Sequence, residues 1–228
     1  MTGTPASGRL ESGQVRAMFD RIAGFYDVMN QVMTAGLHHQ WRRRAVDLAR
    51  VGPGSRVLDV ATGTGDLAIE LRSRGCDVVG SDFSEGMLDR AREKDRSITW
   101  EWGDALDLPY GDGEFAAATV GFGARNFSDL EKGLREMARV VRPGGRVVVL
   151  EITQPQRPPL STFFSIWFDR LVPMLGRFDE AYTYLPNSVK RFPDARSLAG
   201  VMAGAGLTEV GWLLTAGGII AIHHGKVP

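Results

Sequence analysis

The stretch that decides the fold is "VLDVATGTGDLA", residues 57–68. It begins with a short run rich in β-branched residues, which is typical of a buried strand. A turn with Gly63 and Gly65 follows, and "GDLAIELRSRG", residues 65–75, then has a helical pattern. Glycines between a strand and a helix let the backbone turn sharply and approach a ligand closely, with helix N–H groups directed at it. The stretch therefore predicts a nucleotide-type ligand site at the carboxyl end of a first strand.

Downstream of this turn, strand-like and helix-like segments alternate. Strands are predicted in "DVVGSD" (77–82), "ITWEWGD" (98–104), "FAAATVGF" (115–122) and "GRVVVLEI" (145–152). Helices are predicted in "SEGMLDRAREK" (84–94), "DLEKGLREMARVV" (129–141) and "DARSLAGVMAGAG" (194–206). Residues 207–227 form two strand-like runs joined near residues 216–218, which favours a hairpin. We therefore predict an α/β fold with a doubly wound, mostly parallel sheet and an antiparallel C-terminal hairpin.

The chain has 228 residues, which suits one such domain. Residues 1–13 are small and polar, so they are predicted to be a flexible tail without a signal peptide. Residues 14–228 are predicted to form a single domain with two additions: an N-terminal helical cover over 14–50 and an aromatic-rich insertion over 154–193. With no apolar stretch suited to spanning a bilayer, we expect a cytoplasmic protein.

Composition excludes several classes of function. Lys and Arg together equal Asp and Glu in number, so the formal net charge is zero, whereas a nucleic-acid binder normally has a basic excess. The single cysteine, Cys76, cannot form an internal disulfide and lies in an apolar run, so we expect it to be packed. The sequence has no HExxH, no CxxC and no nucleophile elbow. We therefore predict neither a metal site nor a nucleophilic side chain.

Acids after the second and third strands narrow the choice of ligand. Asp82 ends the second strand, where a carboxylate can bind both ribose hydroxyls. Asp104 and Ala105 follow the third strand and could hold an adenine amino group while leaving room for the ring.

The glycine pattern alone does not settle which nucleotide binds. Gly63-x-Gly65-x-x-Ala68 also fits the dinucleotide fingerprint of NAD enzymes. However, Asp66 in the first helical turn would repel a pyrophosphate. S-adenosylmethionine has ribose, adenine and a cationic sulfonium but no phosphate, so an acid-rich pocket suits it better.

These residues resemble the motifs of class I S-adenosylmethionine methyltransferases. Asp59-x-Ala61-x-Gly63-x-Gly65 is similar to their Gly-rich first motif, with Ala61 where that family often has its first Gly. The resemblance implies a Rossmann-like fold and S-adenosyl-L-methionine as cofactor. The cofactor-binding residues are then predicted to be Asp59, Thr62, Gly63, Gly65, Asp82, Phe83, Asp104, Ala105 and Gly121.

Motifs outside this core narrow the resemblance. Tyr26-Asp27-x-Met29-Asn30, followed by Thr34, His38 and Trp41, is similar to a signature of the menaquinone/ubiquinone C-methyltransferases. "RVVRPGGRVVVLEIT" (139–153) resembles their second signature, and "FGARNF" (122–127), "AYTYLPNSVKRFP" (181–193) and "LTAGGIIAIHHG" (214–225) are similar too. The chain departs from that pattern at Gly121, where the family often has Ser.

This resemblance implies methylation of a ring carbon of demethylmenaquinol in menaquinone biosynthesis. Three alternatives stay open: the same chemistry on a ubiquinone precursor or another small phenolic acceptor, an NAD-dependent oxidoreductase, and a module that binds the cofactor without turnover. The elaborate N-terminal signature argues against the last of these.

Methyl transfer to a quinol requires activation of its hydroxyl, because the cofactor already supplies the electrophile. A hydroxyl with a pKa of about 10 costs roughly 4 kcal/mol to deprotonate at pH 7. A neighbouring cation could lower that pKa by about 1–3 units. Arg125, at the carboxyl end of the fourth strand, is the predicted catalytic and substrate-binding cation. The alternative is a surface salt bridge.

Other polar residues match the family motifs. His38 and Tyr26 are predicted catalytic residues, although they could instead only organise the N-terminal cover. Asn30, Tyr182 and Tyr184 are predicted to bind the substrate, the alternative for the two tyrosines being a buried linker.

An isoprenoid-tailed substrate would bring the protein to a membrane surface. "PLSTFFSIWFDRLVPMLGRF", residues 159–178, either packs on the core or receives the tail. Arg42, Arg43 and Arg44 could contact anionic headgroups, although a charge run is usually a solvated helix face. We thus expect a cytoplasmic protein with peripheral contact at the inner face of the membrane; the sequence does not predict an oligomeric state.

Overall fold

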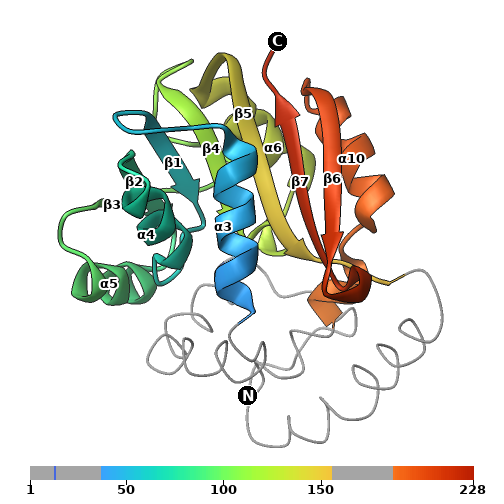
Figure 1. The fold of residues 1–228 in the computed structure, drawn as a ribbon, viewed down its shortest axis with the longest axis horizontal. Helices are drawn as coiled ribbons and strands as arrows, with labels where there is room; N and C mark the ends of the chain where they lie inside the picture. Colours follow the sequence, from blue (N-terminus) through green and yellow to red (C-terminus); the bar gives the residue numbers. More distant parts are fainter. Residues whose placement is uncertain (1–12, 14–36, 156–186) are drawn as a thin grey trace, which may run out of the picture.

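The computed structural model describes Gly13, residues 37–155 and residues 187–228 (Figure 1). The helices and strands of these segments are, in chain order, α3 (His38–Ala49), β1 (Arg56–Val60), α4 (Asp66–Ser73), β2 (Asp77–Asp82), α5 (Glu85–Lys94), β3 (Thr99–Trp102), β4 (Phe115–Gly121), η1 (Ala124–Asn126), α6 (Leu130–Val140), β5 (Val141–Ile152), α10 (Ala195–Gly204), β6 (Thr208–Thr215), η4 (Ala216–Gly218) and β7 (Ile220–Lys226).

The strands form one seven-stranded sheet in the order β3-β2-β1-β4-β5-β7-β6. Strands β1 to β5 pair in parallel, whereas β7 is antiparallel to both β5 and β6. The chain moves outward from β1 to β3 and then returns to place β4 on the other side of β1 (Figure 1). The predicted α/β fold with a C-terminal hairpin is confirmed, and the switch point beside β1 is where such sheets bind ligands.

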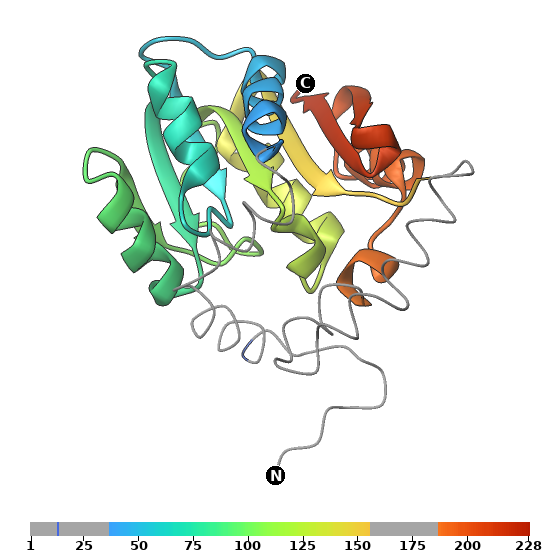
Figure 2. The same ribbon diagram turned by 60° about the horizontal axis from the view of Figure 1, so that its bottom comes forward.

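Helices cover both faces of the sheet. Buried residues of α3, α4 and α5 share one apolar cluster with one face, and those of α6 and α10 share a second cluster with the opposite face. Turning the molecule brings the carboxyl ends of the parallel strands forward between these layers (Figure 2). The loops that follow several strands therefore meet at this end of the sheet.

Helix starts follow from short polar side chains in the sequence. Ser84 accepts a hydrogen bond from the backbone N–H of Met87 and begins α5, and Asp129 does the same for Lys132 at α6. Asp194 caps α10 in the same way. Each cap satisfies a backbone donor that the helix leaves unpaired, which fixes where the helix begins.

Strand β5 starts four residues before its predicted start. Val141 already pairs with Phe115, and the regular ladder resumes at Arg146 opposite Ala117 after a shift in register. The bulge accommodates residues 142–145, "RPGG". This sequence is typical of a turn, so the start of the strand was not predicted. A Cβ on Gly145 would lie 2.5 Å from the carbonyl oxygen of Ala116, so only glycine permits this approach.

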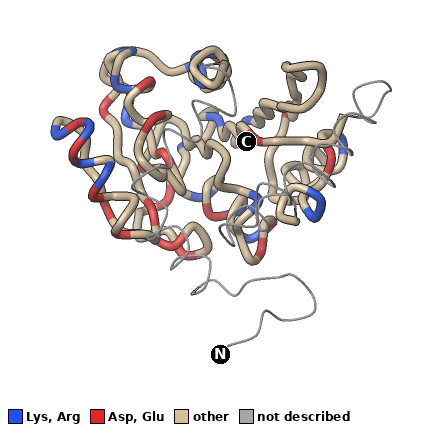
Figure 3. Tube along the Cα trace, turned by 90° about the horizontal axis from the view of Figure 1, so that it is seen from below, with Lys and Arg blue, Asp and Glu red and all other residues tan. Residues whose placement is uncertain are grey.

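Smaller predictions can also be compared with the structure. Cys76 is fully buried, as the sequence predicts, and Gly206 follows α10 with a φ of +95°, a left-handed conformation that favours glycine. Within the described ranges, no helix is both long and apolar enough to cross a membrane. Acidic and basic residues are interspersed around the end of the molecule seen from below (Figure 3).

The domain boundaries stay a prediction. The tail over 1–13, most of the N-terminal cover over 14–50 and most of the insertion over 154–193 fall outside the described residues. The part of the cover that is described, α3, is helical as expected.

Candidate cofactor and active site

A cavity opens at the carboxyl ends of the parallel strands. Its walls include residues 61–64 after β1, Asp82 and Phe83 after β2, residues 103–106 after β3, and residues 121–123 after β4. Eight of the nine predicted cofactor-binding residues line this cavity, and Gly65 is the exception.

Asp59 is the most deeply buried acid of the cavity wall, with 1% of its surface exposed. Its two carboxylate oxygens accept hydrogen bonds from Thr62 Oγ1 and Thr119 Oγ1, both at 2.6 Å. Burial raises the pKa of Asp59 to about 6, with repulsion from Asp82 adding to the effect and the two hydroxyls opposing it. A cationic ligand in this cavity would favour the ionised form of Asp59.

The raised pKa of Asp59 has a consequence for stability. Between about pH 4 and 6 the unfolded chain ionises Asp59 while the native chain keeps it protonated, so the free energy of unfolding should fall by up to about 3 kcal/mol as the pH rises. Asp59→Asn should remove this fall. Urea unfolding at a series of pH values measures it, and parallel pH profiles for the two proteins would contradict the assignment.

Asp82 holds the glycine-rich turn against the end of β2. Its carboxylate accepts hydrogen bonds from the backbone N–H of Gly63 at 2.8 Å and of Ser84 at 2.9 Å. The side chain is therefore fixed in orientation at the cavity wall, where the sequence predicts that it binds ribose hydroxyls.

The two glycines of the turn serve different purposes. Gly63 has a φ of +57°, and a Cβ added to it would meet no atom of the described residues within 4 Å, so its side without a Cβ faces the cavity. Gly65 has a φ of +85°, and its added Cβ would lie 2.4 Å from Trp100 Cη2. The ring of Trp100 also covers Gly80, at 2.4 Å from an added Cβ. Gly65 is thus required for packing against β3, and its predicted contact with the cofactor stays a prediction.

This difference predicts unequal effects of alanine. Gly65→Ala should lower the free energy of unfolding by about 3 kcal/mol, because it combines a left-handed backbone with a clash against an aromatic ring. Gly63→Ala shares only the backbone penalty and should cost about 1 kcal/mol. Chemical denaturation of both variants measures the difference, and equal losses would show that Trp100 yields easily.

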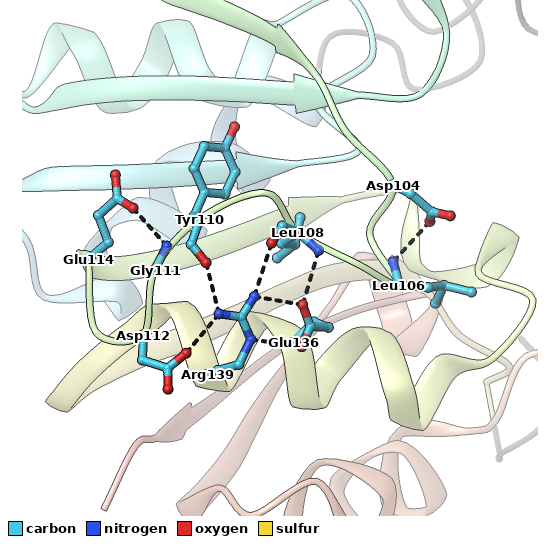
Figure 4. A network of polar contacts seen from close by, with 9 residues as sticks. All are labelled: Asp104, Leu106, Leu108, Tyr110, Gly111, Asp112, Glu114, Glu136 and Arg139. Carbon is cyan, nitrogen blue, oxygen red and sulfur yellow. Dashed lines mark hydrogen bonds and ion pairs between the residues drawn. The ribbon is translucent and has the colours of Figure 1, made fainter.

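The loop that carries Asp104 is fixed to α6 by Arg139 (Figure 4). The Arg139 guanidinium donates to the carbonyl oxygens of Leu108 and Tyr110 at 3.0 and 2.8 Å and pairs with Glu136 and Asp112, both at 2.8 Å. Glu136 in turn accepts from the backbone N–H of Leu108 at 3.0 Å. This network orders the connection between β3 and β4.

At the cavity end of the same loop, Asp104 accepts a hydrogen bond from the backbone N–H of Leu106 at 2.9 Å (Figure 4). The neighbouring wall contains the apolar side chains of Ala105, Leu106, Phe83 and Met87. An acid beside an apolar wall suits the amino group and flat ring of adenine.

Asp66 does not have the isolated charge that the sequence suggests. Its carboxylate pairs with Arg42 at 2.7 Å and with Lys94 at 2.8 Å. Burial raises the pKa of Asp66, but these two cations outweigh burial and lower it below its ordinary range. Repulsion of a pyrophosphate by Asp66 is therefore a weaker argument against NAD than predicted. Arg42 is buried in this pair, which corrects the idea that it reaches lipid headgroups.

Arg125 forms a buried ion pair. Its Nη1 lies 2.7 Å from Glu151 Oε1, and the two side chains are 7% and 1% exposed. The same nitrogen donates to the carbonyl oxygen of Phe122 at 2.5 Å, and Phe122 lines the cavity. The surface salt bridge considered as an alternative is thus wrong, because the pair is buried. Arg125 itself is not among the described residues that line the cavity.

The remaining predicted residues are less well placed by the structure. His38 begins α3 and is 5% exposed, and its ring lies tilted against that of His39 with centroids 4.2 Å apart; it does not line the cavity. Tyr26, Asn30, Tyr182 and Tyr184 fall outside the described residues, so their roles stay predictions.

Several residues in and behind the cavity wall escaped prediction. Asn126, Phe127 and Ser128 line the cavity after β4, next to Phe122, which has a φ of +58°. The polar residues Asn126 and Ser128 follow a strand end and could have been found by that rule. Thr119 could not, because it reaches Asp59 across sixty positions of sequence.

The residues of this cavity fit S-adenosylmethionine. Asp59, Asp82 and Asp104 suit cationic groups and hydroxyl donors, the open side of Gly63 leaves room for a ligand, and an apolar wall adjoins the third acid. These are features that the chemistry of the cofactor requires.

Comparison with known proteins agrees with this cavity. The model of the ubiE/COQ5 methyltransferase family matches residues 8–227. A demethylmenaquinone methyltransferase of Thermus thermophilus is 45% identical over 221 residues, which cover 92% of this chain and all of that protein. One of Deinococcus radiodurans is 46% identical over 213 residues, covering 89% of this chain and 88% of that protein.

Solved structures share the fold. An S-adenosylmethionine-dependent methyltransferase of Thermotoga maritima aligns with a TM-score of 0.69 at 20% identity, covering 93% of this chain and 99% of that chain. The [4+2]-cyclase SpnF aligns with a TM-score of 0.72 at 18% identity, covering 96% and 97%. Likeness at this level of identity concerns the architecture alone, and the two names differ in activity.

Proposed function

The chain belongs to the ubiE/COQ5 methyltransferase family, and from this membership we propose that it methylates a ring carbon of demethylmenaquinol to give menaquinol, using S-adenosyl-L-methionine. The observation that carries the choice of cofactor is the acidic lining of one cavity at the switch point of the sheet, where Asp59, Asp82 and Asp104 stand beside Asp66, which is paired with Arg42. Such a wall favours a cationic ligand without phosphates, which sets a methyl donor apart from NAD.

When bound, the cofactor supplies an electrophilic methyl group on a sulfonium. Asp82 would hold the ribose hydroxyls and Asp104 the adenine amino group, while Asp59 compensates positive charge near the amino-acid end. In the transfer a carbon–sulfur bond breaks, a carbon–carbon bond to the ring forms, and the ring carbon loses a proton. The chain's part is to orient the acceptor and to favour loss of the quinol hydroxyl proton.

The ion pair with Glu151 limits how Arg125 could assist methyl transfer to the quinol. Glu151 compensates the guanidinium charge, so Arg125 would lower the pKa of a quinol hydroxyl less than a lone cation would. Through its bond to the Phe122 carbonyl it also holds the cavity wall. We therefore propose Arg125 first as a positioning residue, with direct contact to the quinol as the alternative.

We propose that the carboxyl end of the sheet faces the cytoplasmic surface of the membrane, because a lipid-tailed quinol must enter there. Exposed Leu37, Trp102 and Leu214 all lie at that end, at the start of α3 and near the ends of β3 and β6. Exposed Arg43 and Arg44 of α3 support attraction to anionic headgroups. Flotation with anionic vesicles tests this contact.

Methyl transfer to chemically reduced demethylmenaquinone and to the ubiquinone precursor, assayed side by side, tests the proposed reaction. We expect turnover with the reduced naphthoquinol and none with the oxidised quinone, whose ring carbon is electron-poor. Preference for the ubiquinone precursor would reassign the acceptor. Binding of NAD in place of S-adenosylmethionine would overturn the methyltransferase assignment.

A further inference from the structure

A second cavity lies at the opposite end of the sheet. It is lined by Ser55 just before β1, Ala116 near the start of β4, residues 142–146 at the start of β5, Glu209 near the start of β6 and Lys226 at the end of β7. All these positions lie at the amino ends of the parallel strands, whereas the cofactor cavity lies at their carboxyl ends. The two cavities are therefore separate.

The lining of this second cavity is strongly basic. Among the described residues that line it, four cations, Arg50, Arg142, Arg146 and Lys226, face a single carboxylate, Glu209. The chain as a whole has no net charge, so this concentration is local. A cluster of cations is normally stabilised by opposite charges at close range. Here the one carboxylate, Glu209, compensates only part of the positive charge of the four cations.

Arg146 is the most buried of these four cations. Its side chain is 7% exposed, yet the carboxylate of Glu209 lies 3.8 Å away and is itself bound to Lys226 at 3.0 Å. The closer contact of Arg146 Nη1 is His224 Nδ1 at 2.9 Å. Because a guanidinium can only donate, this nitrogen must accept, so His224 is neutral here. Burial and the nearby charges of Arg146 and Arg50 lower the pKa of His224, which agrees with a neutral ring.

Residues other than glycine with a positive φ lie in the walls of both cavities. Among the described residues, five that are not glycine have a positive φ. Ala61 and Phe122 line the cofactor cavity, Arg50 at +51° and Glu209 at +47° line the basic cavity, and Ala216 lies in the hairpin turn. Arg50 has this conformation because it is the left-handed C-cap that ends α3. At Glu209 the conformation costs energy, and such residues tend to gather at functional sites. The strain at Glu209 accompanies the bulge from which its carboxylate reaches Lys226.

We propose that the basic cavity is a second binding site, specific for a doubly or more highly charged phosphate group. The planar guanidinium groups of the exposed Arg50 and Arg142 can each offer paired N–H donors to phosphate oxygens, and the buried Arg146 adds positive charge behind them. Gly144, where an added Cβ would meet nothing within 4 Å, leaves open space beside them. A phosphate seated here adds a second anion near Arg146, besides the Glu209 carboxylate at 3.8 Å.

Calorimetric titration of the full chain with pyrophosphate at low ionic strength tests the site. We expect one equivalent to bind, with an affinity about tenfold weaker in Arg142→Gln and in Arg50→Gln, since each removes a charged hydrogen-bonding partner at an exposed position. Arg56→Gln is the matched control, because Arg56 lies at the same end of the sheet, is exposed and does not line the cavity. Its affinity should match that of the wild type.

A second arm separates soluble phosphates from lipid headgroups. Vesicles of phosphatidylcholine with phosphatidic acid replace pyrophosphate, and if only these bind, with Arg142→Gln weaker than Arg56→Gln, the phosphate belongs to a lipid. Absence of binding in both arms, or an equal loss in Arg56→Gln, overturns the proposal. Asp82→Ala should bind pyrophosphate as the wild type does, which keeps this result independent of the cofactor cavity.

Discussion

Asp82→Ala should weaken the binding of S-adenosylhomocysteine by at least about 100-fold. The carboxylate is assigned to both ribose hydroxyls, and a hydrogen bond to a charged acceptor contributes about 1.5–3 kcal/mol. The substitution also removes the acceptor that holds the Gly63 N–H at 2.8 Å, so the turn beside the cofactor loses its anchor. Calorimetry measures the affinity. Asp82→Asn keeps one acceptor oxygen, so its affinity should lie between those of the wild type and Asp82→Ala.

A matched control is available on the same strand. Asp77 begins β2 and is exposed at the end remote from the cavity, so Asp77→Ala should leave affinity unchanged. If Asp82→Ala bound the cofactor product within about threefold of the wild type, the ribose assignment would have to be abandoned. If both variants lost affinity equally, the effect would belong to strand β2 and not to the carboxylate.

The second large effect is expected at the buried ion pair. Arg125→Ala leaves Glu151, which is 1% exposed, without its cation, and removing one partner of a buried pair typically costs about 3–5 kcal/mol. The free energy of unfolding should fall by that amount, as measured by urea denaturation. Replacing both partners with apolar residues, Arg125→Met together with Glu151→Leu, should recover most of the loss.

The double variant also decides how Arg125 serves the reaction. If Arg125 only positions the cavity wall, turnover should return in part as folding is restored. If it touches the quinol, turnover should stay low although the protein is stable and binds S-adenosylhomocysteine normally. A single Arg125→Ala variant with unchanged stability would contradict the buried pair itself.

The sequence predicts the fold well because its determinants are local. Alternating strand and helix patterns specify the parallel sheet, and residues that follow strand ends meet at one edge, which is how Asp82 and Asp104 could be assigned to a cavity. Strand β5 was partly hidden because residues 142–145 read as a turn, although a bulge keeps them within the sheet.

The partners of the charged side chains could not be predicted, because each lies far away in sequence. Arg42 meets Asp66 from α3, and Glu151 meets Arg125 from the end of β5. A residue's own motif gives its type and approximate place but not what compensates its charge. For that reason the sequence did not predict that cations compensate the charge of Asp66, which therefore disfavours NAD less strongly, or that Arg125 is buried.

Trp100 places a limit on how this family member can change through evolution. Its ring occupies the space that a side chain on either Gly65 or Gly80 would need. Substitutions at these glycines should therefore be tolerated only after Trp100 has been replaced by a smaller residue, so the order of mutations matters. Selection on a single indole ring thus constrains a turn in the first motif and the middle of a neighbouring strand at once.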